Sequence, residues 1–202
     1  SFWTTDSATG GPEAGGDVNM VGRTGDTIRC SITGPPDSTN DAMRIALRVD
    51  VLSENDKLRL TIGPMGEQET VELGVKEYSD WITLEFKPRK GGPKVSGIVR
   101  FYCMGTNPEF GLYMTPIQID PANPAMPISH PTVYSIYLAK KLGPFATLGL
   151  AEDTWALNER VIDEEAFWKQ SLNIWEERRA QLFDALKTTR KGSVVCVFDG
   201  TD

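Results

Sequence analysis

The stretch RIALRVDV, residues 44–51, places an apolar side chain at every second position. Strict alternation is typical of a strand in an antiparallel sheet, with one face buried and the other in water. The same period recurs in the runs 57–62, 82–86, 99–103, 112–114 and 117–119. Short segments rich in Gly, Pro, Asn and Asp separate these runs, as turns between strands would. The pattern predicts an antiparallel β-sandwich-like domain over residues 24–120, preceded by an irregular, Gly-rich lead-in over residues 1–23.

The second half of the chain has a helical period. A Pro-rich stretch, residues 120–127, marks the change, and a helix is predicted over Pro131–Leu142. Asp163 is a suitable N-cap for a longer helix of about 25 residues. Apolar residues recur along that helix at three- and four-residue steps, which predicts one apolar face: Trp168, Leu172, Trp175, Leu182 and Leu186.

Five consecutive apolar residues, VVCVF at 194–198, follow the long helix. Such a run is typical of a strand that is buried on both faces, as in parallel sheets. A helix that leads into a buried strand is an α/β feature, so residues 121–202 are expected to contribute a helical segment and one strand to an α/β core. The fold class predicted for the whole chain is α+β. Because such a strand needs neighbours on both sides, and because the first residue is Ser rather than Met, we expect an internal piece of a larger protein.

Composition and charge disfavour some classes of function. The chain has 202 residues and a formal net charge of −7, so a nucleic-acid-binding surface is not expected, because such surfaces need clustered Lys and Arg. No apolar run is long enough for a transmembrane helix. Cys30, Cys103 and Cys196 are odd in number and lack metal-binding spacing, which predicts buried free thiols. Free thiols favour a cytoplasmic location, and a periplasmic or secreted location stays open.

The candidate chemistry lies just after the predicted strand. Loops at the carboxyl ends of strands collect ligands in open α/β sheets, and Asp199 and Asp202 could bind a divalent metal there. The alternative is that Asp199 makes a turn and Asp202 caps a following helix. His130 is the only histidine, and a polar loop role is expected for it. The sequence FDGT at 198–201 lacks the nucleophilic Asp of the haloacid dehalogenase signature, since Val197 stands at that position.

Other polar and aromatic residues are expected to have structural roles. Asp6-Ser7 superficially resembles the nucleophile segment of alkaline phosphatases, but the Gly-Gly-Pro at residues 10–12 cannot continue the helix that this segment needs. The acidic pairs at 152–153 and 176–177 are expected on solvated helix faces. The five tryptophans are expected in the core or at a domain interface: Trp3, Trp81, Trp155, Trp168 and Trp175.

Residues 124–202 resemble part of the type I phosphodiesterase/nucleotide pyrophosphatase family, within the alkaline phosphatase superfamily. The similarity is carried by four segments, PISHP (127–131), VYSIYLAK (133–140), LGPFATLGL (142–150) and VVCVFDGTD (194–202). The opening SFWTTD (1–6) is similar to the point at which such proteins enter a β-rich insertion. The resemblance implies that the intact protein uses a Thr or Ser nucleophile and two divalent metal ions, commonly zinc. Its substrate would be a phosphodiester or a nucleotide-like small molecule.

The resemblance assigns one residue of this chain to the metal site. Family members carry a ligand pair, Asp-x-x-x-His, just after a buried strand, and Asp202 takes the place of that Asp. The His, the nucleophile and the remaining ligands are expected outside the chain, so the chain alone is expected to be inactive and to hold no metal. The alternative functions are a non-catalytic β-sandwich module that binds carbohydrate or protein, with helices appended, and a purely structural interface domain.

Overall fold

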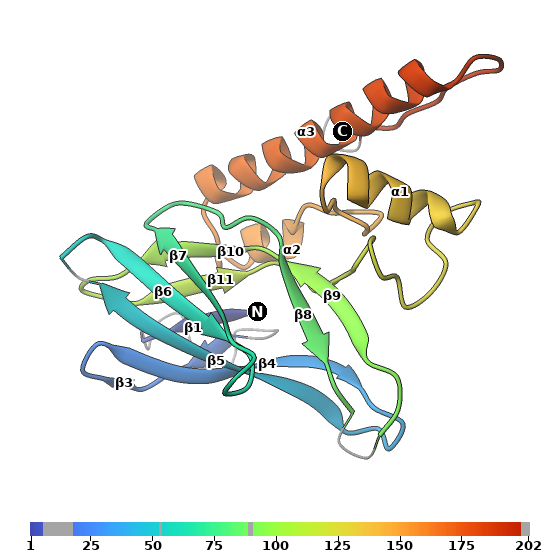
Figure 1. Cartoon of the computed structure of the whole chain (residues 1–202). Coiled ribbons are helices and arrows are strands. Elements are labelled where there is room, and N and C mark those ends of the chain that lie inside the picture. The colour runs from blue at the N-terminus through green and yellow to red at the C-terminus, as the bar shows by residue number, and fades with distance from the viewer. Residues whose placement is uncertain (6–17, 53, 89–90, 199–202) are drawn as a thin grey trace.

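The structure, a computed structural model, describes residues 1–5, 18–52, 54–88 and 91–198 (Figure 1). The described part is mixed α+β, with twelve strands and three helices, and its strand pairs are mostly antiparallel, which confirms the predicted class. The strands are β1 (Phe2–Thr4), β2 (Val18–Met20), β3 (Arg23–Thr24), β4 (Thr27–Pro36), β5 (Ala42–Leu52), β6 (Lys57–Ile62), β7 (Glu69–Gly74), β8 (Ile82–Phe86), β9 (Val95–Val99), β10 (Phe101–Gly105), β11 (Gly111–Met114) and β12 (Gln118–Ile119). The helices are α1 (Val133–Leu142), α2 (Thr154–Asn158) and α3 (Glu164–Thr188).

The longest strands form a five-stranded antiparallel sheet in the order β3-β4-β5-β6-β7. The alternation predicted for β5 is confirmed, because Ile45, Leu47 and Val49 are buried whereas Arg44 and Arg48 are exposed. Strands β4 and β6 pair with β5 in registers that keep the apolar side chains of all three strands on one face. A shift by one residue would turn that apolar face to water, so the pattern itself specifies the register.

Two smaller sheets, in the orders β10-β11-β1-β2 and β12-β9-β8, complete the β-rich part. Strand β1 lies inside the first of them, antiparallel to β11 and parallel to β2. The expectation of an irregular lead-in over residues 1–23 is therefore wrong at β1, β2 and β3. Strands this short leave no periodic signal in the sequence, and pairing with the distant β11 decides the structure of Phe2–Thr4.

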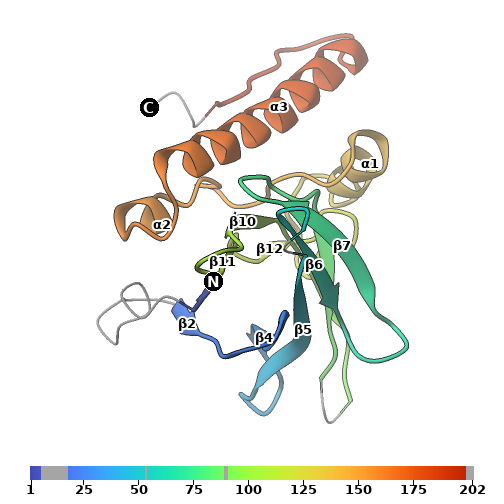
Figure 2. The same cartoon turned by 90° about the vertical axis from the view of Figure 1, so that its left-hand side faces the viewer.

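One apolar core is shared by the three sheets, which we call together the sheet module (the described residues of 1–120). Its buried residues come from every sheet and include Trp3, Ile28, Leu47, Leu60, Leu84, Phe86, Phe101 and Leu112. Figures 1 and 2 show the sheets enclosing this common interior. Gly34 permits the close packing of β4 on β8, since a Cβ at this position would lie 2.1 Å from the Phe86 ring.

The helices lie together on one side of the sheet module (Figures 1 and 2). The predicted helix Pro131–Leu142 is confirmed as α1, and it ends before Gly143, which has a φ of 94°. The predicted N-cap of the long helix is also confirmed, because the Asp163 side chain accepts a hydrogen bond from the Ala166 backbone N at 2.8 Å. Glu164 and Glu165 occupy the first turn, where the helix dipole favours negative charge.

The structure does not show the buried strand that is predicted over residues 194–198. The segment forms no strand and makes no ladder with another described strand. Val195 and Val197 are 86% and 67% exposed. A strand of this composition is stable only between neighbouring strands and beneath covering layers, and the described residues supply neither at this place.

Candidate functional site

Helix α3 directs most of its large apolar side chains into solvent, whereas Phe167 and Ile174 pack inward. Five of them have exposed fractions between 39% and 64%, and we call them the outer stripe: Trp168, Leu172, Trp175, Phe183 and Leu186. The sequence pattern correctly groups most of these residues on one helix face, but the structure leaves that face open to solvent. Trp3 is in the core, as expected, whereas Trp155, Trp168 and Trp175 lie on the surface of the described part, so the domain interface expected for these three stays a prediction.

The opposite face of α3 lies against the sheet module and, at Asp184, against α1, and it carries several polar side chains. Its buried residues recur at intervals that keep them on one side of the helix: Ala166, Gln170, Ile174 and Asp184. The Glu177 side chain lies on the same side and is only 14% exposed. A helix that buries polar residues and exposes apolar ones is oriented opposite to a usual surface helix.

Glu177 is the centre of the polar contact that holds α3 on the sheet module. Its Oε1 accepts hydrogen bonds from Trp81 Nε1 at 2.7 Å and from Arg100 Nη2 at 3.0 Å. Its Oε2 accepts a third hydrogen bond, from the Ala146 backbone N at 2.8 Å. The Arg100 guanidinium also lies 4.8 Å from the centre of the Trp81 ring, a cation–π contact. We call these four residues the Glu177 cluster; because its two charged side chains are largely sheltered, each hydrogen bond is stronger than a surface contact.

A second polar group anchors the beginning of α3 and the short helix α2. Gln170 Oε1 accepts a hydrogen bond from the Asp153 backbone N at 2.7 Å, and the Asp153 carboxylate accepts one from Tyr113 Oη at 2.7 Å. Burial, followed by the nearby charge of Asp153, raises the pKa of Tyr113 far above its ordinary value, so the phenol is a permanent donor. The expectation that the acidic pairs lie on solvated faces is therefore wrong for Asp153 and Glu177.

The segment 194–198 runs next to α3 and adds to its exposed apolar surface (Figure 2). The Phe198 ring lies 6.3 Å from the Trp175 ring, centroid to centroid. The outer stripe and this segment therefore form one apolar surface on the side of α3 that faces away from the sheet module. Surfaces of this kind mark sites of contact with another protein layer.

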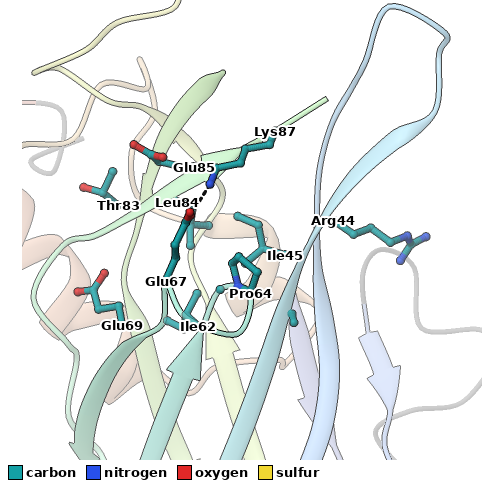
Figure 3. Close-up of a pocket in the computed structure, with 12 residues that line it drawn as sticks. Arg44, Ile45, Ile62, Pro64, Glu67, Glu69, Thr83, Leu84, Glu85 and Lys87 are labelled. Atoms are coloured by element: carbon teal, nitrogen blue, oxygen red, sulfur yellow. Dashed lines mark hydrogen bonds and ion pairs between the residues drawn. The ribbon is translucent and has the colours of Figure 1, made fainter. Parts of the chain in front are cut away.

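A separate groove of about 540 Å³ lies between β5, β8 and the loop that joins β6 to β7 (Figure 3). Its floor is apolar, with Ile45, Ile62 and Leu84 among its residues. Across the groove, Lys87 donates a hydrogen bond to Glu67, and this contact holds the pKa of the Glu67 carboxyl below its usual range. Glu69 and Glu85 also line the groove, and Glu85 pairs with Lys94 at 3.1 Å, so the rim carries more acidic than basic groups.

The residues that the sequence singles out for chemistry are not brought together. Asp199 and Asp202 lie outside the described residues, as do Asp6 and Ser7. His130 is exposed in a loop, as expected. Among the residues that the structure describes, no group of three or more His, Cys, Asp and Glu side chains is placed to hold a metal ion.

The three cysteines are free, as predicted, but the predicted burial is confirmed only for Cys103. Cys103 is buried in the core, and Cys30 is half-buried against it. Desolvation raises the pKa of each of these thiols to about 12, so both are protonated at neutral pH and neither is a nucleophile. Cys196 is also half-buried, in the segment 194–198.

No protein-family model, curated protein or solved structure matches the chain. None of the described helices is both long enough and apolar enough to span a membrane.

Sequence reasoning missed the polar residues that position α3. Gln170 and Glu177 repeat along the helix face opposite to the predicted apolar stripe, and this spacing was available in the sequence. Their partners are Arg100, which lies between β9 and β10, and Tyr113 in β11. Both are more than fifty residues away along the chain. No local pattern connects residues at that separation, so only the three-dimensional structure could pair them.

Proposed function

We propose that the chain is part of a metal-dependent phosphohydrolase similar to the type I phosphodiesterase/nucleotide pyrophosphatase family. In this proposal, α3 and residues 194–202 belong to the α/β catalytic core, and the sheet module is an accessory part that shapes access to the active site. The substrate would be a phosphodiester or a nucleotide-like small molecule.

The observation that carries the proposal is the apolar surface formed by the outer stripe and the segment 194–198. A helix that leads into an apolar, β-branched segment is the repeating unit of an α/β layer, in which the strand joins a sheet and the helix packs on it. Both parts of this unit are exposed and adjacent in the structure, with Phe198 beside Trp175. A core sheet that received residues 194–198 as a strand would also cover the outer stripe.

Asp202 would then lie at the carboxyl end of that strand, where α/β folds place their ligands. The resemblance gives it the role of one ligand in a site for two divalent metal ions, with zinc as the expected metal. The described residues do not fit such a site by themselves. The nucleophile and the other ligands would come from outside this chain, and we assign no catalytic step to the described residues.

The polar contacts of α3 give the accessory part a fixed position. The hydrogen bonds of Glu177 with Trp81 and Arg100, and that of Gln170 with Tyr113, hold the sheet module on the face of α3 opposite to the proposed core. One helix would thus contact the catalytic core with one face and the accessory part with the other. This arrangement would set where the sheet module stands relative to the active site.

The test is hydrolysis of bis-p-nitrophenyl phosphate by the intact protein that carries this chain, after removal of metal and after addition of zinc. We expect activity that returns with metal and is lost, together with bound zinc, in the variant Asp202→Asn. Asp56→Asn is the matched control, since it changes the same chemistry in the exposed turn between β5 and β6 and should leave activity and zinc content unchanged.

An Asp202→Asn protein with normal activity and zinc content would contradict the assignment of Asp202. An intact protein without activity under any metal would contradict the phosphohydrolase proposal as a whole.

The groove of Figure 3 favours a second candidate, a non-catalytic module that binds carbohydrate or protein. Its volume of about 540 Å³ lies in the range of small-molecule sites, and its apolar floor with polar groups at the rim suits a ligand that has both apolar and polar parts. Thr83 lies exposed on the groove wall, so Thr83→Arg should block it. A glycan or peptide that binds the 202-residue chain and loses binding in Thr83→Arg would bring this candidate to the front.

A further inference from the structure

A polar cavity of about 320 Å³ lies beside β4 and β5, next to β2 and the residues that follow it. Strands β4 and β5 supply its charged and hydroxyl side chains, and the residues from Asn19 to Gly22 form another wall. The described residues that line the cavity include two arginines, Arg29 and Arg44, and no acidic residue. The chain has a net charge of −7, whereas the charged side chains among the described residues of this cavity are both basic.

The two arginines share this face because of the strand register. Thr33 pairs with Arg44 and Arg29 pairs with Arg48, so alternation directs all four side chains away from the core. Arg44 Nη1 contacts only hydroxyl groups, Ser31 Oγ at 3.4 Å and Thr33 Oγ1 at 3.3 Å. Figure 3 shows its side chain turned away from the groove described above.

The nearby carboxylate does not neutralise these arginines. Asp50 accepts hydrogen bonds from Arg48 Nη2 at 2.9 Å and from Thr27 Oγ1 at 2.6 Å. Arg59, on the same face of the sheet, forms an ion pair with Glu72 at 2.8 Å. Arg29 and Arg44 therefore form no ion pair with the described residues, while Arg48 and Arg59 do.

A guanidinium group carries a permanent charge and a planar set of N–H donors that match the oxygen atoms of a phosphate. Two such groups line this one cavity together with the Ser31 and Thr33 hydroxyls, so the cavity offers several donors to an anion. A volume of about 320 Å³ also leaves room for a small organic group beside the anion.

We propose that this cavity binds a phosphate anion, either free or as the terminal group of a small phosphomonoester. The proposal is independent of the phosphohydrolase proposal, because the cavity lies on β4 and β5 and contains neither the outer stripe of α3 nor Asp202. The site requires no metal and no catalytic residue.

The test is titration of the 202-residue chain with ribose 5-phosphate, inorganic phosphate and ribose, followed by isothermal calorimetry and by backbone amide shifts in NMR spectra. We expect ribose 5-phosphate to shift the amides of β4 and β5, and ribose to have no effect. Arg29→Gln and Arg44→Gln should each weaken binding about tenfold or more, because each removes charge-assisted hydrogen bonds. Arg59→Gln is the matched control on the same sheet face and should bind as the unmodified chain does.

The two phosphate probes distinguish the source of the anion. Equal affinity for inorganic phosphate would identify free phosphate as sufficient, and tighter binding of ribose 5-phosphate would identify the phosphomonoester; both results support the site. Equal binding of ribose, equal loss of affinity in Arg59→Gln, or no binding of either phosphate probe to a folded chain would overturn the proposal. Because the readout is binding to the isolated chain, its failure is distinct from a failure of phosphodiester hydrolysis.

Discussion

The five-stranded sheet and helix α3 both sort their side chains onto two faces, but they direct the apolar face in opposite senses. In β5 and β6 the apolar face points into the core shared by the three sheets, with Leu60 fully buried. In α3 the outer stripe points into solvent, and the face toward the sheets carries Gln170 and Glu177. The difference shows that a periodic pattern identifies the residues that share a face. The pattern does not determine whether another element covers that face.

The largest difference between the two regions is expected in the reactivity of their thiols. Raising the pKa of Cys30 and Cys103 from 9.0 to about 12 lowers the thiolate fraction at pH 8 roughly a thousandfold, and burial slows access further. Cys196 lies in the exposed segment 194–198 and should react first with Ellman's reagent under native conditions. Mass spectrometry of the labelled chain would identify the site, and rapid labelling of Cys103 in the folded chain would contradict the packing of the sheet core.

The same substitution at two leucines gives the next largest effect. Leu60→Ala should lower the free energy of unfolding by about 2–5 kcal/mol, because it removes a fully buried side chain and leaves a cavity. Leu172→Ala, on the outer stripe, should change it by less than about 0.5 kcal/mol, since the side chain is 42% exposed. Urea unfolding of both variants measures the difference. A similar loss in Leu172→Ala would show that the outer stripe is packed in solution and would remove the contrast.

A smaller effect is expected at the polar face of α3. Glu177→Gln should lower the free energy of unfolding by about 1–3 kcal/mol, because Arg100 loses its carboxylate in a largely sheltered position. Glu176→Gln is the neighbouring control, since Glu176 pairs with Arg179 on the exposed side and should contribute little.

Hydrogen exchange gives the second readout for this pair of variants. In Glu177→Gln the amides of α3 should exchange faster while those of β5 and β6 keep their protection, because only the attachment of the helix is weakened. Equal effects of the two substitutions would mean that the Glu177 cluster does not hold α3 in place.

The sequence predicts the sheet strands well because their signal is local. Residues 44–51 specify both the strand and its buried face, and Asp163 specifies the start of α3 through its own side chain. Phe2–Thr4 could not be predicted, because its structure depends on β11 at the other end of the module. The segment 194–198 has the composition of a buried strand, yet the described residues offer it no sheet to join.

The candidate site shows the same division between local and distant signals. The apolar repeat from Trp168 to Leu186 is readable in the sequence, but its exposure is not, because exposure depends on which other elements pack nearby. The Glu177 cluster joins residues from four separated parts of the chain, and the register of β4 and β5 places Arg29 and Arg44 at one cavity. Asp199 and Asp202 stay predictions, since they lie outside the described residues.

The central position of β1 also has a consequence for the order of folding. Met114 N donates a hydrogen bond to the Ser1 carbonyl oxygen at 2.8 Å, across a sequence separation of 113 residues. Contacts between such distant residues carry a large entropic cost of loop closure and are associated with slow folding. During synthesis, Phe2–Thr4 cannot pair with β11 until β11 has been made. Trp3 cannot pack into the core shared by the three sheets before that point. The four-stranded sheet is therefore expected to close late, after the hairpins of β4 to β7 have formed from neighbours along the chain.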